Sequence, residues 1–239
     1  MSITKSEEII ILMIFWDSIW WFGKDFLSLY KEINHLKIKN MKNTNSEVES
    51  LVNDFNTIFY DQTYTKWRLK KERAGKDIVG SCYEEFRRKV YTDFGLKLGK
   101  NKKVMGSNFN ADVVVEIDGV VKIVEECKGH YVDSCFLKRA IGNFAELIMK
   151  CYDSKLEVPF FVLSCPTRMR NFESTFNNYI KIYRDDIQKD IISKFKYIPL
   201  CKNGRIKKSD YFMNKSNCFD LDQTLVENQI TFIKKLTEK

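Results

Sequence analysis

The stretch Asn110–Gly129, NADVVVEIDGVVKIVEECKG, decides the fold of the chain. β-branched side chains dominate residues 111–117 and 120–128, and Asp118-Gly119 between them is a common turn dipeptide. The stretch therefore predicts a β-hairpin with most of its charged residues at the end away from the turn.

The open end of this hairpin carries three acidic residues and one lysine, Asp112, Glu125, Glu126 and Lys128. If the loop holds three residues, side-chain alternation places Asp112, Glu126 and Lys128 on one face. If the turn holds two residues, Asp112 pairs with Glu125 instead, and Glu126 points to the other face. Both registers set Asp112 beside a second carboxylate, and two such groups repel unless a cation or proton lies between them.

Carboxylates and an amine in this arrangement suit metal-dependent hydrolysis of a phosphodiester. Oxygen ligands favour Mg²⁺, and the presence of only two histidines in the chain argues against zinc. Lys128 beside a bound metal would hold or deprotonate the attacking water, while the metal neutralises charge on the phosphate.

Asp112, followed by Glu126-Cys127-Lys128 at the end of a β-branched strand and before a helix, resembles the PD-(D/E)xK nuclease superfamily, the fold of many type II restriction endonucleases. The resemblance covers roughly residues 80–200 and implies an α/β core. It implies that Asp112 and Glu126 are metal ligands, that Lys128 orients the water, and that Glu84 of a G-x-x-x-E motif adds to the metal site. Asn110-Ala111-Asp112 lacks the proline of the family's name.

Two of the acidic residues also have structural interpretations. Ser81-x-x-Glu84 is a capping box, in which Glu84 would bond back to the Ser81 amide at the start of a helix. Glu125 is either an alternative ligand, if the shorter turn holds, or the partner of a nearby lysine. Cys127 should point into the core, where thiols act as small hydrophobes.

Helices and strands alternate around the hairpin. Apolar residues recur every four positions in the helical stretches, whereas VPFFVLSC is typical of a strand buried on both faces. In chain order we expect a helix at 81–94, a basic turn at 97–103, the hairpin, a helix beginning at Asp133 or Ser134, a strand at 158–165, a helix at 172–194, a strand at 197–200 and a helix at 223–236. This order predicts an α/β fold with a mixed central sheet flanked by helices.

The chain divides into three regions. We expect residues 1–76 to form a helical N-terminal region with a basic segment, 77–200 a nuclease core, and 201–239 a basic loop and C-terminal helix. The apolar run Ile9–Phe22 is too short to span a membrane. We expect it to pack against the body or in a dimer interface, with contact to a membrane surface as the minor alternative.

Charge favours a polyanionic partner. The 239 residues hold 40 Lys plus Arg against 32 Asp plus Glu, a net charge of +8. Basic residues around an aromatic suit contacts with nucleic-acid phosphates and bases, although they would equally suit a solvated helix face. The candidate nucleic-acid contacts are Lys66, Trp67, Arg68, Lys70, Lys71, Lys102 and Lys103.

The seven cysteines are scattered, form no C-x-x-C pair, and are accompanied by only two histidines, which excludes a zinc site of ordinary spacing. Unpaired cysteines of this kind indicate a reducing compartment, the cytoplasm. With the charge, the resemblance implies a Mg²⁺-dependent endonuclease that cuts double-stranded DNA. We expect a type II restriction enzyme, acting as a homodimer and possibly paired with a cognate DNA methyltransferase. The alternatives are a structure-specific, transposon or repair nuclease of the same fold, or a nucleic-acid-binding protein without enzymatic activity.

Overall fold

The structure is a computed structural model that describes residues 45–63, 75–99, 106–107, 110–129, 131–202 and 219–237. Residues Val48–Lys239 form one compact unit, separate from Met1–Glu47. The apolar run at 9–22 and its expected dimer contact lie outside the described residues. Within the described ranges, none of the helices combines the length and the apolar character that a membrane span requires.

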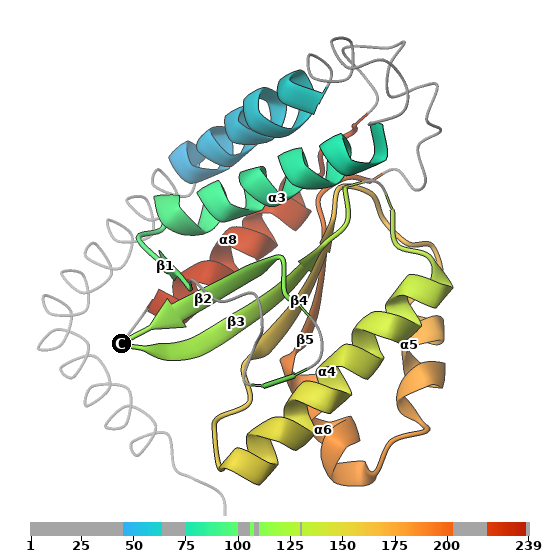
Figure 1. Cartoon of the computed structure of the whole chain (residues 1–239). Coiled ribbons are helices and arrows are strands. Elements are labelled where there is room, and N and C mark those ends of the chain that lie inside the picture. Colours follow the sequence, from blue (N-terminus) through green and yellow to red (C-terminus); the bar gives the residue numbers. More distant parts are fainter. Residues whose placement is uncertain are drawn as a thin grey trace, which may run out of the picture. The chain divides into compact units, whose positions relative to one another are not determined.

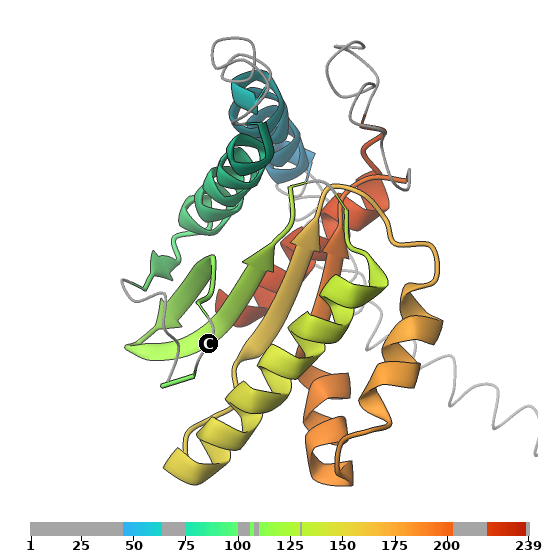
Figure 2. The same cartoon turned by 45° about the vertical axis from the view of Figure 1, so that its right-hand side comes forward.

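A five-stranded mixed sheet forms the centre of the larger unit, with its strands in chain order (Figure 1). The first three strands pair antiparallel and the last three pair parallel. The strands are β1 (Lys97–Leu98), β2 (Val113–Ile117), β3 (Val120–Cys127), β4 (Phe160–Cys165) and β5 (Phe195–Pro199). As a result, the carboxyl ends of β3, β4 and β5 all lie at the same end of the sheet (Figure 2).

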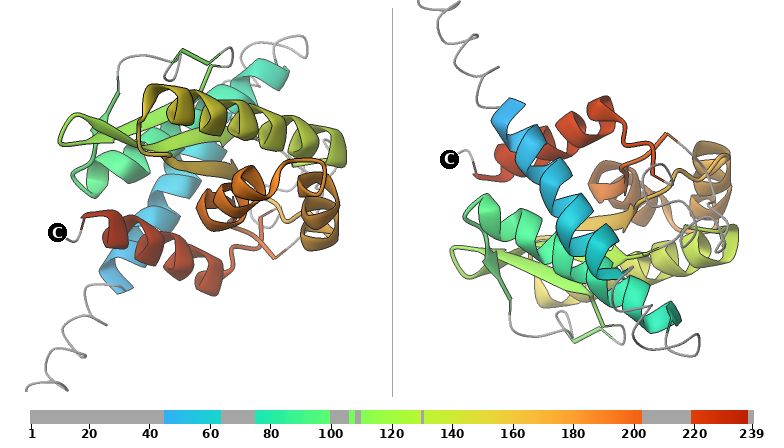
Figure 3. Two further views of the ribbon diagram at one scale, coloured as in Figure 1. Left: turned by 90° about the horizontal axis from the view of Figure 1, so that it is seen from below. Right: turned by 90° about the horizontal axis from the view of Figure 1, so that it is seen from above.

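Helices cover both faces of the sheet, so the predicted α/β class is confirmed. One face packs against α4 (Ser134–Ser154), α5 (Phe172–Ile180) and α6 (Asp185–Lys194). The other packs against the π-helical segment η1 (Phe55–Asp61), α3 (Gly75–Asp93) and α8 (Gln223–Thr237). Seen from above, the helix that contains η1 lies across α3 and α8 (Figure 3).

Side-chain alternation divides the strands between two apolar cores. Val114 and Val124 belong to the core beneath α4, whereas Val113 and Ile123 belong to the core beneath α3. β4 contributes to both cores because it lies between two parallel neighbours, as its continuous apolar sequence predicted. The hairpin is therefore held from both sides.

The predicted start of α4 is confirmed. The side chain of Asp133 accepts a hydrogen bond of 2.7 Å from the amide of Phe136 and so caps the helix. The apolar residues that follow at helical spacing are buried against the sheet: Leu137, Ile141, Phe144, Ile148 and Cys151. This cap fixes where α4 begins relative to the end of β3.

Three predictions about residues 75–98 are wrong. α3 begins at Gly75, because its buried stripe extends back through Ile78 and Val79. Ser81 thus lies inside the helix and starts no capping box. Lys97 and Leu98 form β1 rather than a turn, pairing with Glu116 and Val115 of β2.

The single helix expected at 172–194 is two helices, α5 and α6. Ile180 and Ile187 are both buried in the core beneath α4, but Ile182 between them is 72% exposed. A break here lets both helices turn an apolar face to the same core. Asp185 and Asp186 open α6, where negative charge favours a helix N-terminus.

Candidate active site

The turn of the hairpin contains two residues. Asp118 and Gly119 have φ angles of 51° and 77°, both left-handed, and Ile117 pairs with Val120 across them. Asp and Gly tolerate this conformation, which matches the twist of the flanking strands. The three-residue loop considered from the sequence is therefore wrong.

A β-bulge then shifts the register by one residue. Glu116 pairs with Val121, but Val115 pairs with Ile123, so Lys122 is the additional residue. Beyond the bulge Val113 lies opposite Glu125, and continuing by one residue sets Asp112 opposite Glu126. Neither register expected from the sequence is correct, because neither included the bulge.

Asp112 is tied to the end of β3. Its backbone amide donates to the carbonyl of Glu125 at 3.0 Å, and its carboxylate oxygen Oδ2 accepts a bond of 2.7 Å from the amide of Cys127. Burial raises the pKa of Asp112, and the negative charges of Glu84 and Glu125 raise it further. The bond from Cys127 and the charge of Lys128 act in the opposite direction.

Glu126 is 8% exposed and lies on the side of α4. Its Oε1 accepts a bond of 3.3 Å from Asn143 of α4. Its Oε2 is buried and has no hydrogen-bond partner among the described residues. Burial raises the pKa of Glu126, and the charge of Asp112 raises it further, against the opposing charges of Arg139 and Lys128.

Lys128 completes the cluster. Its Nζ lies 3.8 Å from the ring centroid of Phe136 on α4, and the Arg139 guanidinium lies 4.5 Å from the same centroid. Burial lowers the pKa of Lys128, as does the charge of Arg139, whereas Glu126 and Asp112 raise it. An amine with a lowered pKa exchanges a proton more readily near neutral pH than an ordinary lysine does.

Gly129 lets the chain leave this cluster beneath α3. A Cβ atom at position 129 would lie 2.7 Å from the carbonyl oxygen of Val79 and 2.8 Å from its carbonyl carbon. Such contacts with backbone cannot be relieved by a side-chain movement. Position 129, directly after Lys128, therefore has room only for glycine.

Glu125 faces the opposite side of the sheet. Its carboxylate binds the guanidinium of Arg87 on α3 at 2.6 and 3.2 Å and accepts a hydrogen bond from the hydroxyl of Tyr91. Both charged side chains are fully buried. The partner of Glu125 is thus an arginine rather than one of the lysines, and its carboxylate points away from Glu126. Cys127 lies against the same core, as predicted.

Glu84 lies near the cluster but is bound to Arg88. The guanidinium of Arg88 contacts the Glu84 carboxylate at 2.8 Å and also donates to the carbonyl of Asp112. Among the residues that the structure describes, no three His, Cys, Asp or Glu side chains are grouped as a metal site would require. Two carboxylates, those of Asp112 and Glu126, are therefore candidate metal ligands, whereas the Glu84 carboxylate is paired with Arg88.

The donor set nevertheless fits a hard cation. A buried carboxylate oxygen without a partner is costly, and the pKa values of both acids are raised by burial and by neighbouring negative charge. A divalent cation beside Asp112 and Glu126 would satisfy Oε2 of Glu126 and remove the repulsion. The described residues thus provide a two-carboxylate site beside a lysine.

Sequence reasoning missed the contribution of α4. Phe136, Arg139 and Asn143 stand at i, i+3 and i+7, so they share one face of the helix, and this face is turned to Glu126 and Lys128. The spacing was visible in the sequence, but it did not show that this face of the helix meets the end of β3. The predicted nucleic-acid contacts Lys66, Trp67, Arg68, Lys70, Lys71, Lys102 and Lys103 lie outside the described residues.

The fold and site together define an α/β protein with a buried pair of carboxylates and a lysine where the hairpin ends. Comparison of the chain with family models, curated proteins and solved structures found no match. The functional argument therefore depends on the geometry and chemistry of the site itself.

Proposed function

We propose that the protein is a Mg²⁺-dependent endonuclease that cuts double-stranded DNA and is built on a PD-(D/E)xK core. The observation that carries this proposal is the unpartnered, buried Oε2 of Glu126, whose carboxylate interacts electrostatically with the Asp112 carboxylate and with the Lys128 amine. A buried polar atom without a partner calls for an explanation, and a bound ion or a catalytic role is one.

Each side chain has a distinct role in this proposal. Asp112 and Glu126 hold the magnesium ion, which supplies charge neutralisation at the phosphate when it is bound. Lys128, whose pKa is lowered, holds the attacking water and accepts its proton. Asn143 and Arg139 orient Glu126, the first by a hydrogen bond and the second by its charge.

The DNA substrate is supported by the charge of the chain. A net charge of +8 suits a partner with a phosphate backbone. Two carboxylates and a lysine are also the groups that would activate a water molecule to attack a phosphorus atom. Within this class we propose a type II restriction enzyme that acts as a homodimer in the cytoplasm, paired with a DNA methyltransferase. A two-fold enzyme would match a palindromic site.

Incubation of plasmid and phage DNA with the protein and Mg²⁺, followed by sequencing of the ends, tests this function. Discrete fragments with common ends support the restriction enzyme, whereas cuts confined to nicks, junctions or ends support a structure-specific nuclease of the same fold. We expect Lys128→Ala to reduce cutting by about 100-fold or more, the usual contribution of a general base. Lys128→Arg should do the same, because arginine keeps the charge but does not give up its proton.

Lys122→Ala is the matched control. It removes a lysine from the same hairpin, where Lys122 pairs with the partly exposed Glu157 at 2.6 Å. DNA binding, measured in EDTA, should stay unchanged in all three variants because phosphate contacts are spread over many basic residues. Unchanged DNA binding without any magnesium-dependent cutting by the native chain would favour a non-enzymatic DNA-binding protein.

A further inference from the structure

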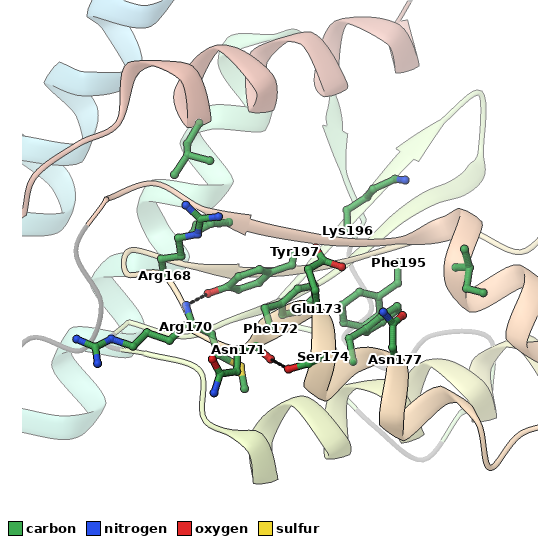
Figure 4. Close-up of a pocket in the computed structure, with 15 residues that line it drawn as sticks. Arg168, Arg170, Asn171, Phe172, Glu173, Ser174, Asn177, Phe195, Lys196 and Tyr197 are labelled. Atoms are coloured by element: carbon green, nitrogen blue, oxygen red, sulfur yellow. Dashed lines mark hydrogen bonds between the residues drawn. The ribbon is translucent and has the colours of Figure 1, made fainter.

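A pocket is lined mainly by the segment after β4, by α5 and by β5. Its volume is about 700 Å³, which is the size of a small-ligand site (Figure 4). Arg168 and Arg170 stand at one end of the pocket and Asn177 at the other, with the rings of Phe172 and Tyr197 between them. The pocket thus combines cations with an aromatic wall.

The segment that carries the two arginines is fixed to β5 and the residues after it. The hydroxyl of Tyr197 donates to the carbonyl of Thr167 at 3.1 Å and accepts from the amide of Met169 at 2.8 Å. The amides of Leu200 and Cys201 donate to the carbonyl of Pro166 at 3.2 and 2.9 Å. The backbone on both sides of Arg168 is therefore held in place before any ligand binds.

Both arginine side chains are exposed and available for an anion. Neither forms an ion pair with a carboxylate in the part of the chain that the structure describes. Glu173 is the acidic residue of the lining, and the amine of Lys196 donates instead to the carbonyl of Ser193 at 3.0 Å. A guanidinium binds phosphate through two parallel hydrogen bonds, so this excess of positive charge favours a phosphorylated ligand.

The aromatic wall favours a ligand that also has a flat ring. Phe172 and Tyr197 are stacked, with ring centroids 4.3 Å apart and an interplanar angle of 16°, and Phe172 is partly exposed to the pocket. Phosphate beside a stacking surface is the combination that nucleotides require. A paired base inside a double helix cannot reach such a surface, so the nucleotide must be unpaired.

The arginine end of the pocket lies at the same end of the sheet as the candidate active site. Cys127 pairs with Ser164 in the parallel sheet, and the amide of Lys128 donates to the carbonyl of Ser164 at 2.9 Å. The segment with Arg168 begins two residues later, at the same edge of the sheet, where open α/β sheets usually bind their ligands.

We propose that this pocket binds an unpaired nucleotide of the DNA substrate, with its phosphates on Arg168 and Arg170 and its base against Phe172 and Tyr197. This inference rests on the proposed nuclease function and narrows its substrate to DNA that contains, or is opened to give, an unpaired base. For the restriction enzyme proposed above, it requires that one base of the site be turned out of the duplex.

The test is binding in EDTA, where no cutting occurs. Fluorescence anisotropy compares three labelled duplexes that differ at one position: fully paired, with one unpaired adenine, and with an abasic site there. We expect the native chain to bind the unpaired adenine about tenfold more tightly than the paired duplex, as is usual for one stacked base.

The double variant Arg168→Ala/Arg170→Ala should lose this preference. Phe172→Leu should bind the adenine and abasic duplexes equally.

Lys181→Ala/Lys189→Ala is the matched control, because it removes the same charge from exposed positions outside the pocket. It should keep the preference, and circular dichroism should show that all variants are folded. Equal binding of the three duplexes by the native chain overturns the pocket proposal alone, as does equal loss of preference in the two double variants. Failure to bind any DNA overturns the nuclease proposal as well.

Discussion

The carboxylates of Glu125 and Glu126, adjacent in sequence, lie on opposite faces of the central sheet. Glu125 is bound to Arg87 of α3, whereas Glu126 lies against α4 with one oxygen unpartnered. Glu125 thus has a structural ion-pair partner, whereas Glu126 has a carboxylate oxygen without a partner among the described residues. This division predicts that substitutions at the two positions have opposite effects on stability.

Arg87→Met should destabilise the protein by about 3–5 kcal/mol, because it leaves the buried Glu125 charge without its cation. The free energy of unfolding, measured with urea, checks this. The double variant Arg87→Met/Glu125→Leu should recover much of the loss. Arg184→Met, which breaks an ion pair with side chains 73% and 50% exposed, is the control and should cost at most about 1 kcal/mol. Similar losses from Arg87→Met and Arg184→Met would contradict the buried network.

Glu126→Gln should stabilise the metal-free protein while it abolishes cutting. Glutamine keeps the shape of the side chain and removes a buried charge whose pKa is raised by burial and by Asp112. We expect a gain of about 0.5–2 kcal/mol, the usual size of a single stabilising substitution. The urea midpoint and the plasmid assay measure the two effects. A less stable, fully active variant would show that Glu126 is a structural residue.

The stability of the metal-free protein should fall as pH rises through the acid range. Asp112 and Glu126 have pKa values raised in the folded state above their ordinary values of 3.8 and 4.5, so folding favours their protonated forms. Their contribution is complete below those ordinary values and is lost as pH rises through the raised ones. Mg²⁺ should therefore stabilise the native chain more at pH 8 than at pH 5, as measured by Tm.

Asp112→Asn/Glu126→Gln is the comparison for the pH experiment, since other acids titrate in the same range. Subtracting its Tm from that of the native chain isolates the two acids. The double variant should show no stabilisation by Mg²⁺ at either pH. An equal response to Mg²⁺ in both proteins would place the metal elsewhere.

Gly129→Ala should cost about 1–3 kcal/mol and reduce cutting, because the added Cβ meets the Val79 backbone and displaces the chain beside Lys128. Gly142→Ala is the control. Its Cβ would meet only the Tyr183 hydroxyl, at 3.7 Å, and alanine in a helix interior gains about 0.5–1 kcal/mol over glycine. Thermal unfolding compares the two variants, and opposite shifts in Tm are expected.

The layers of this fold could be predicted from the sequence, but the register of its central hairpin could not. Apolar spacing located α4 and β4, because burial demands a fixed period. The bulge at Lys122 has no such signal, since a lysine is acceptable at either a paired or a bulged position. The meeting of Glu126 with Asn143 also depends on packing between elements distant in sequence.

Arg87 has a consequence for how β3 can move. Adjacent glutamates are interchangeable in shape. If β3 slipped by one residue, Glu126 would face α3 and Glu125 would face α4, and the valines of β3 would change sides as well. The guanidinium and the Tyr91 hydroxyl hold the first of the two acids and act as a register lock. The tandem acidic pair can therefore stand in one strand without producing two competing registers.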